Sequence, residues 1–418
     1  MHRREFIQRT SALSAAFGLP HSVRSLQTSA DPSPVPAHPS LIPPPAPISE
    51  AEREQRRDTA RRLLRQLDFS AMLIEPGPNM TYFAGIEWGR SERLFAFLLP
   101  ISGRPVVIAP AFEQQRAEDQ VAGRFDIRVW QEDQNPEVLV ADTMRDLGLG
   151  TGRLALDPSA RTFVLTEIAL ARPGLQFATA ANVINRCRGV KSPHEIEIMT
   201  FANQTTLEAY RAAFKTLKVG MTQAELAQNV SGEMRKLGYQ GGALVLFGES
   251  SAYPHGLPKP RSLDENQVIL VDGGLSVHGY QSDMTRTVVF GTPTPEMKKV
   301  FDIVHEAQAR AVAFAAPGKM CGEVDAVARK VITEAGYGPD YRTFTHRLGH
   351  GIGLEGHEWP YLVRGSQVML EPGMTFSDEP GIYQYGKFGI RLEDIMAITE
   401  NGAEMMTPTQ TGLADSQI

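Results

Sequence analysis

The chain has 418 residues, of which 42% are hydrophobic and 22% charged, a composition typical of a globular protein large enough for two or three domains. Its net charge of −6 provides no basic surface of the kind that binds nucleic acid. Only two cysteines occur, Cys187 and Cys321, which excludes a disulfide framework and a cysteine-based metal site.

The N-terminus carries features of a targeting segment. The sequence RREFIQ, which begins at Arg3, is followed by a weakly apolar stretch at 11–19, and together they resemble a twin-arginine export signal. The apolar stretch is too short to anchor the chain stably in a membrane. We therefore expect residues 1–30 to be a signal peptide that exports a bacterial protein to the periplasm or beyond; a disordered basic tail is the alternative. Residues 31–48 are rich in proline and predict an extended linker.

From residue 49 to about 185 the sequence predicts an α/β domain. Ser49 and Glu52 form a capping box for a first helix, whose apolar stripe includes Ala60 and Leu64. Short apolar segments predict strands at 71–75, 95–100, 105–110, 126–130, 153–157 and 175–180. Segments near 112–122, 136–148 and 162–172 predict helices between them.

A second domain is predicted for residues 186–418. Ser192 is suited to cap a helix that has Pro193 at its first position. The predicted order is two helices (193–217, 222–237), strands (243–248, 267–274, 282–290), two more helices (294–315, 321–335) and a final set of strands. This order suggests an internal duplication, with two similar halves that face each other across a sheet. The whole chain is therefore expected to be α+β.

Four carboxylates occupy unusual positions in these strand-like segments. Asp272 ends one apolar run and Asp283 opens the next, with a hairpin predicted between them. Glu379 follows an apolar strand, and Glu393 is predicted to lie inside another. Carboxylates embedded in apolar β-structure are costly unless they are paired with a cation or bind a metal. Pairing with arginines such as Arg286 and Arg391, or a solvated strand end, is the alternative for each of them.

One short segment, HRLGHGIGLEGHEWP at 346–360, holds three of the ten histidines: His346, His350 and His357. A zinc-binding helix is excluded, because its glycines would destabilise a helix and the HExxH pattern is missing. The glycines instead predict a strand and loop that approach the bound groups closely. Four carboxylates and one of these histidines would suit Mn²⁺, with Co²⁺ or Zn²⁺ also possible, and bridging carboxylates suit a pair of ions.

These motifs carry a resemblance. The segments VDGG, SDMTRT, GHGIGLEGHEWP, DEPGIY and RLEDI resemble the Xaa-Pro dipeptidase and aminopeptidase P family of dinuclear metallopeptidases. The resemblance implies a C-terminal pita-bread domain at 186–418 and a smaller creatinase-like domain at 49–185. It also implies the metal ligands: Asp272 on one ion, Asp283 and Glu393 bridging two, and His350 and Glu379 completing the shell of the other.

The resemblance further implies a mechanism in which a hydroxide that bridges two divalent ions attacks the scissile carbonyl. Glu379 would accept the proton and pass it to the leaving nitrogen. His255, His346 and His357 are predicted to bind the substrate or stabilise the intermediate, and Arg391 to orient Glu393 or meet a substrate carboxylate. The expected substrates are small peptides with proline in second position, and the expected assembly is a homodimer.

Several alternatives stay open at this point. An aminopeptidase P-type enzyme, which removes residues from longer Xaa-Pro peptides, differs from a dipeptidase only in how the substrate's C-terminal side is enclosed. A methionine aminopeptidase is disfavoured by the presence of residues 49–185 as an extra domain. A pita-bread protein that binds without catalysis is disfavoured because all five predicted ligands are present.

Overall fold

The computed structural model describes residues 43–150, 152–414 and 418. The predicted signal peptide and most of the proline-rich linker lie outside the described residues. Within the described ranges, no helix combines the length and hydrophobicity needed to cross a membrane.

The first helix, α1 (Glu50–Gln66), begins as the sequence predicts. The Ser49 hydroxyl accepts a hydrogen bond from the backbone N–H of Glu52, and the Glu52 carboxylate accepts one from the backbone of Ser49. Ala60 and Leu64 are fully buried on the inner face of the helix. The capping box and the apolar stripe therefore act together to place α1 against the sheet that follows.

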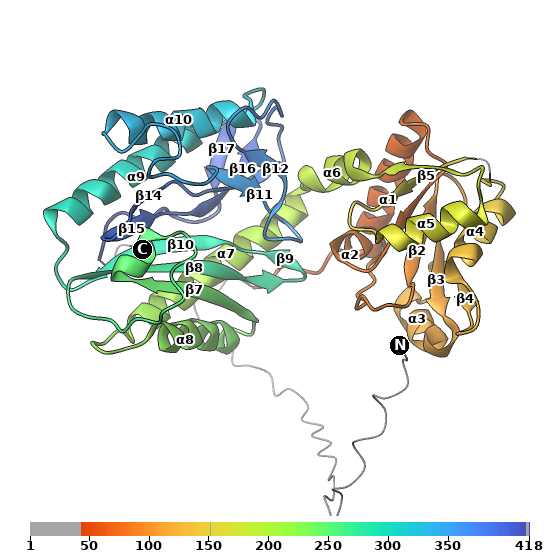
Figure 1. The fold of residues 1–418 in the computed structure, drawn as a ribbon, viewed down its shortest axis with the longest axis horizontal. Helices are drawn as coiled ribbons and strands as arrows, with labels where there is room; N and C mark the ends of the chain where they lie inside the picture. The colour runs from red at the N-terminus through yellow and green to blue at the C-terminus, as the bar shows by residue number, and fades with distance from the viewer. Residues whose placement is uncertain (1–42, 151, 415–417) are drawn as a thin grey trace, which may run out of the picture. The chain divides into compact units, whose positions relative to one another are not determined.

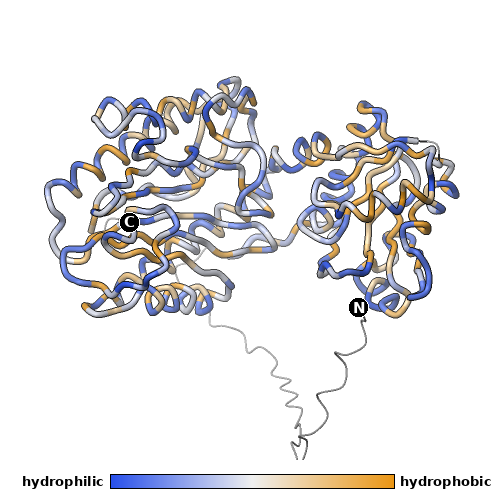
Figure 2. The backbone as a smooth tube through the Cα atoms, viewed as in Figure 1, coloured by the Kyte–Doolittle hydropathy of each residue, from blue (hydrophilic) through white to orange (hydrophobic). Residues whose placement is uncertain are grey.

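The N-terminal domain is a mixed six-stranded sheet with the order β4-β3-β2-β1-β5-β6, covered by helices (Figure 1). Its remaining elements are β1 (Ala71–Ile74), α2 (Pro78–Ala84), β2 (Ala96–Pro100), β3 (Val106–Pro110), η1 (Ala111–Glu113), α3 (Gln114–Val121), β4 (Asp126–Trp130), α4 (Pro136–Asp146), β5 (Arg153–Leu156), α5 (Thr162–Ala171), β6 (Gln176–Thr179) and α6 (Ala181–Gly189). Figure 2 shows these central strands as largely hydrophobic.

Both faces of this sheet are buried, because alternate side chains of each strand contact different helices. Met72 and Ile74 of β1 pack with α1, α2, α3 and α6, whereas Ala71 and Leu73 pack with α4 and α5. The predicted strands and the helices α3, α4 and α5 are confirmed, with ends that differ by a few residues. The sequence did not predict α2 and α6, because both helices are short and lack a side-chain cap.

The C-terminal domain follows the predicted order. Its elements are α7 (Pro193–Phe214), α8 (Gln223–Lys236), β7 (Gly241–Phe247), η2 (Gly248–Ala252), β8 (Gln267–Val277), β9 (Tyr280–Gln281), β10 (Met284–Phe290), α9 (Pro295–Phe314), α10 (Cys321–Glu334), β11 (Gly349–Gly351), β12 (Glu358–Leu362), β13 (Thr375–Asp378), β14 (Gly381–Gln384), β15 (Phe388–Arg391), β16 (Asp394–Thr399) and β17 (Gly402–Met405). Ser192 caps α7 with Glu195 in a capping box, as expected.

Two helix-covered sheets and a two-stranded sheet, β14-β15, make up the described part of this domain. The first has the order β10-β8-β7 and packs against α7 and α8; the second has the order β12-β11-β13-β16-β17 and packs against α9 and α10 (Figure 1). Two similar halves are therefore present. The expectation of a single sheet between them is wrong, because each half has its own sheet, and a bridge between Thr285 and Glu393 joins the two.

A fully buried ion pair reinforces this junction. Arg286, in β10, contacts Asp394, in β16, at 2.6 Å and also donates to the backbone carbonyl of Glu393 at 2.9 Å. The second oxygen of Asp394 accepts a hydrogen bond from Gln308, and its first also accepts one from Thr407. The charged groups of the pair are thus almost completely satisfied inside the domain.

Removing one partner of this pair is predicted to destabilise the protein strongly. Asp394→Ala would leave the Arg286 guanidinium buried without a counter-charge, at a cost of about 3–5 kcal/mol in the free energy of unfolding. The exposed pair of Glu306 and Arg310 provides the control, because Glu306→Ala should change stability very little. Urea denaturation of both variants measures the difference, and equal midpoints for the two would contradict this account.

Candidate active site

Three of the predicted carboxylates meet where the two sheets join. Asp272 lies in β8 opposite Thr285 of β10, and Asp283 lies just before β10. Asp272, Asp283 and Glu393 each place one oxygen within 4.8 Å of the others. Residues that are up to 121 positions apart in the chain (272 and 393) thus form one cluster, as the pairing of β8 with β10 and of β10 with Glu393 requires.

Glu393 does not lie inside a strand, contrary to the prediction. It occupies the break between β15 and β16, where its N–H donates to the carbonyl of Thr285 at 3.2 Å. The Thr285 hydroxyl donates to its carboxylate at 2.7 Å. The break turns the Glu393 side chain toward the first sheet, which a continuous strand within the second sheet would not do.

His350 and Glu379 join the cluster from the second sheet. His350 lies in β11 and is buried, and its Nε2 is 3.3 Å from Glu379, 3.8 Å from Asp283 and 4.0 Å from Glu393. Its Nδ1 is 3.1 Å from the carbonyl of Gly351, so Nδ1 must carry the proton and Nε2 is left with a lone pair. This is the tautomer that a metal ligand needs.

The cluster therefore fits a pair of cations. His350, Glu379 and Glu393 form one group of donors within 4.8 Å of each other, Asp272, Asp283 and Glu393 form another, and Glu393 belongs to both. A shared carboxylate between two donor groups is the arrangement expected for two neighbouring divalent ions. The structure thus brings all five predicted ligands together.

The electrostatics of the cluster point the same way. Burial and the neighbouring carboxylates raise the pKa of Asp283 to about 8, and the pKa of Glu379 likewise to about 8. Burial and the same neighbours raise the pKa of Glu393 well above its ordinary value. Burial lowers the pKa of His350 to about 3. His350 is therefore neutral near pH 7, and the three carboxyl groups would be ionised together at that pH only if cations offset their charges.

Arg391 is a buried residue that contacts the carboxylate cluster. Its guanidinium contacts Asp272 at 2.7 Å and donates to the Thr285 hydroxyl at 3.1 Å, which in turn donates to Glu393. It also donates to the Tyr383 hydroxyl at 2.8 Å. Arg391 is buried, so the geometry favours the predicted orienting role over contact with a substrate carboxylate, and its direct partner is Asp272.

Tyr383 is a site residue that the sequence reading missed. Its hydroxyl is 2.7 Å from Nε2 of His346, whose Nδ1 is 2.8 Å from the carbonyl of Arg347. Since Nδ1 faces a carbonyl, it must donate, and Nε2 accepts from Tyr383. Both nitrogens of His346 are therefore engaged by the protein, and the predicted contact between His346 and substrate would require one of these bonds to break. The available signal in the sequence was that Tyr383 lies four residues after the predicted ligand Glu379.

His357 and His255 are both exposed, and His357 contacts the cluster. The His357 ring is exposed and stacks on the His350 ring, with 3.6 Å between centroids and 15° between planes. It also lies within 4.8 Å of donor atoms of Asp283 and His350. His255 is exposed in the loop after η2. About 18% of the Asp283 side chain remains accessible, so solvent and a substrate can reach the carboxylates.

The glycines around His350 serve the packing of β11. A Cβ atom on Gly349 would lie 1.9 Å from the carbonyl oxygen of Ser377 in β13, and one on Gly351 would lie 2.7 Å from that of Glu358 in β12. The expected close approach is therefore present, but it is an approach to the neighbouring strands. This close packing places β11, which carries His350, between β12 and β13 and next to Glu379.

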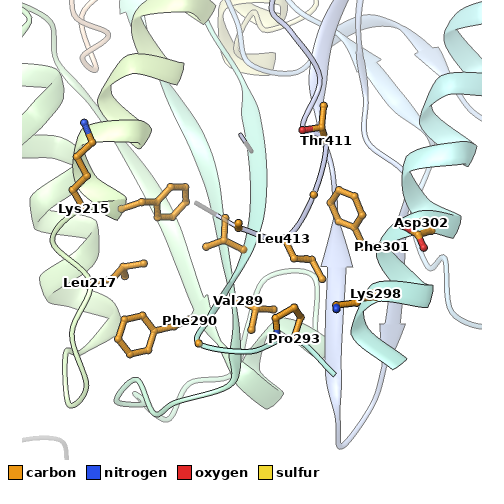
Figure 3. Close-up of a pocket in the computed structure, with 15 residues that line it drawn as sticks. Lys215, Leu217, Val289, Phe290, Pro293, Lys298, Phe301, Asp302, Thr411 and Leu413 are labelled. Carbon is orange, nitrogen blue, oxygen red and sulfur yellow. The ribbon is translucent and has the colours of Figure 1, made fainter. Parts of the chain in front are cut away.

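Several cavities border the C-terminal domain in the described residues, and two of them bear on the location of the site. One of about 530 Å³ lies beside His357 and Tyr361 and also contacts Asn79 and Arg188. Another, of about 650 Å³, is lined mainly by apolar side chains from α7, β10 and α9, with Lys215 and Lys298 among them (Figure 3). The described residues that line the second cavity include none of the predicted ligands, so its size does not make it the site of the chemistry.

Comparison with known proteins agrees with this geometry. Residues 197–400 match the model of metallopeptidase family M24, and residues 56–190 match the creatinase/prolidase N-terminal domain. The chain is 32% identical over 344 residues to the Xaa-Pro dipeptidase of Lactobacillus helveticus. The aligned region covers 80% of this chain and 92% of that protein.

Solved structures show the same fold. The dipeptidase PepE of Mycobacterium ulcerans superposes with a TM-score of 0.82 at 32% identity, covering 88% of this chain and 99% of that one. The X-Pro aminopeptidase of Thermotoga maritima superposes with a TM-score of 0.72 at 31% identity, covering 84% and 97%. These relationships confirm the predicted α+β class, with a creatinase-like N-terminal domain and a pita-bread C-terminal domain. The chain is therefore a hydrolytic peptidase and belongs to metallopeptidase family M24.

Proposed function

We propose that this protein is an exopeptidase that hydrolyses Xaa-Pro bonds with two divalent ions held by Asp272, Asp283, His350, Glu379 and Glu393. The observation that carries the proposal is the pair of donor groups that share Glu393. Four carboxylates and one imidazole are a ligand set suited to Mn²⁺, with Co²⁺ and Zn²⁺ as alternatives. The names of the relatives support a substrate with proline after the scissile bond.

When bound, the two ions would polarise the scissile carbonyl and lower the pKa of a water molecule in the site. Glu379 lies 3.3 Å from His350 and keeps 14% of its side chain exposed, so we expect it to accept a proton from that water. The same carboxyl can then donate the proton to the leaving nitrogen. That delivery matters for this substrate, because an Xaa-Pro bond is a tertiary amide and has no N–H for an enzyme to hold.

Other side chains would hold the reacting groups in place. Arg391 keeps Asp272 oriented, and through the Thr285 hydroxyl it also keeps Glu393 oriented. His357, which contacts the cluster, is placed to donate a hydrogen bond to the oxygen of the scissile carbonyl as it gains negative charge. His255, which is exposed, is the candidate residue for a contact with the substrate farther toward solvent.

The choice between dipeptidase and aminopeptidase P activity rests on which substrates fit. We favour the dipeptidase, in line with the names of the Lactobacillus helveticus and Mycobacterium ulcerans relatives. Export through a twin-arginine signal is part of the same proposal, and it rests on the sequence around Arg3. Assembly as a homodimer is also part of the proposal, and it rests on the resemblance to the family. Light scattering of the purified protein would test it.

Chelation and substrate length provide the main test. Dialysis against a chelator should abolish hydrolysis of an Xaa-Pro dipeptide, and Mn²⁺ should restore it. The restored enzyme should cleave the dipeptide faster than the matching Xaa-Pro-Yaa tripeptide, as measured by release of free proline or of the Pro-Yaa product. Full activity in the chelator would refute the metal proposal, and a preference for the tripeptide would favour the aminopeptidase.

Loss of Asp283, which the family resemblance predicts to bridge the two ions, should eliminate activity. Asp283→Ala removes an oxygen donor from the cluster, so essentially all turnover and about one of two bound ions should be lost. Asp302→Ala is the matched control, because Asp302 is exposed on α9 beside the distant apolar cavity. Metal content by mass spectrometry and turnover are measured together. Near-normal turnover of Asp283→Ala would contradict the assignment.

Metal binding should release protons near neutral pH. In the metal-free protein the pKa of Asp283 and that of Glu379 are each about 8, so both groups are largely protonated at pH 7 and must lose protons when ions bind. Both values exceed the ordinary ones, so the metal-free fold should also lose stability as the pH rises from about 4 through about 8. Calorimetry at pH 7 in buffers of different ionisation enthalpy measures the proton release, which should decline above pH 8. Binding heats that do not depend on the buffer would contradict it.

A further inference from the structure

A network of buried charges connects the N-terminal domain to the segment that carries His357. Arg188, near the end of α6, donates to the side-chain oxygen of Asn79 at 2.6 Å and forms ion pairs with Glu358 and, at 2.8 Å, with Glu355. Lys191 contacts the other oxygen of Glu358 at 2.8 Å. Arg188, Lys191 and Glu358 are each less than 8% exposed, so the network is almost free of bulk water.

The network continues into the N-terminal domain. The amide nitrogen of Asn79, at the start of α2, lies 3.1 Å from both carboxylate oxygens of Asp157, which follows β5. One of those oxygens also accepts hydrogen bonds from the backbone and hydroxyl of Ser159. Arg188 therefore stands between a rigid polar cluster on one side and Glu358 on the other.

Glu358 directly follows His357 and begins β12. Its backbone pairs with Gly351, the residue after the predicted ligand His350. Its carboxylate also occupies the space next to Gly353, where a Cβ atom would lie 2.7 Å from Oε1 of Glu358. Residues 352–357 connect β11 to β12, and the side chain of Glu358 lies at the end of this connection.

Burial alone would raise the pKa of Glu358, but Lys191 and Arg188 more than offset it and lower that pKa. The carboxylate is therefore held as an anion by two cations from the α6–α7 junction. Glu355, in the same loop, contacts the same guanidinium. The loop is thus attached to Arg188 at two points, one on each side of His357.

We propose that Arg188 is a positioning residue for the reaction, which acts by holding the 353–358 loop so that the His357 ring stays stacked on His350 and faces the substrate. This inference rests on the proposed function, because it assigns His357 a catalytic contact. It also gives the N-terminal domain a role in the chemistry, since that domain supplies Arg188 and its support through Asn79. Arg188 and His357 border the same cavity of about 530 Å³.

A double-mutant cycle on the metal-loaded, full-length protein tests the proposal. Arg188→Gln should lower kcat for an Xaa-Pro dipeptide roughly 10- to 100-fold, whereas the content of bound Mn²⁺ stays that of the wild type. In a protein that already carries His357→Gln, the same change should lower kcat by no more than about twofold. Arg188→Lys, which retains the charge and one contact, should recover part of the loss. Equal effects of Arg188→Gln in both backgrounds would overturn the proposal.

Arg56 provides the matched control. It is also a buried arginine of the N-terminal domain that contacts the C-terminal domain, through Glu195 at 3.1 Å and Tyr280 at 2.8 Å, and among the described residues its partners lie outside the 353–358 loop. Arg56→Gln should lower the midpoint of unfolding without coupling to His357→Gln. If Arg56→Gln coupled as strongly as Arg188→Gln, the effect would be one of general stability and the proposal would fail.

Hydrogen exchange gives a readout that does not depend on activity. Peptides that span residues 351–360 should exchange at least about threefold faster in Arg188→Gln than in the wild type or in Arg56→Gln, whereas peptides from α7 should not differ. Unchanged exchange in 351–360 would overturn the proposal even if activity fell. Wild-type protein that fails to cleave any Xaa-Pro peptide with Mn²⁺ would instead refute the proposed function, and the exchange result would still decide whether Arg188 holds the loop.

Discussion

The junction between the two sheets of the C-terminal domain is the constraint on which the candidate site depends. Thr285 and Glu393 are bridged there, and the adjacent residues, Arg286 and Asp394, form a buried ion pair. Each half of the domain supplies only part of the ligand set. Because the side chains on either side of the bridge point in opposite directions, one junction provides both a buried ion pair on one face and a carboxylate of the candidate site on the other.

Burying four carboxylates beside one another is unfavourable, and the structure shows how the protein limits the cost. Arg391 neutralises Asp272 directly, and hydroxyl groups from Thr285 and Ser377 donate to Glu393 and Glu379. These few donors cannot satisfy all the lone pairs in the cluster, and the pKa values of Asp283 and Glu379 stay near 8. The negative charge that these donors leave uncompensated is what gives such a site its affinity for divalent ions.

The surroundings of the histidines divide them into different roles. His350 has a tautomer set by Gly351 and a free Nε2 that faces the carboxylates. His346 is held through both nitrogens, whereas His357 is exposed and is held mainly through its neighbours in the loop. A side chain that must meet a substrate cannot be tied down by its own polar atoms, so its position has to come from the backbone around it. The ion pairs of Arg188 supply that support from the N-terminal domain.

The sequence by itself determined most of the helices and strands, because caps and apolar runs are local signals, and its short motifs pointed to the candidate ligands. Ser49 and Ser192 mark helix starts, and Asp272, Asp283, His350, Glu379 and Glu393 all lie in recognisable segments. Only the tertiary structure decided that Glu393 lies at a break between strands and that the Tyr383 hydroxyl is hydrogen-bonded to Nε2 of His346. It also decided that Arg188 contacts the loop that carries His357. Each of these depends on side chains brought together from distant segments, such as residues 188 and 358, and no local pattern encodes such a contact.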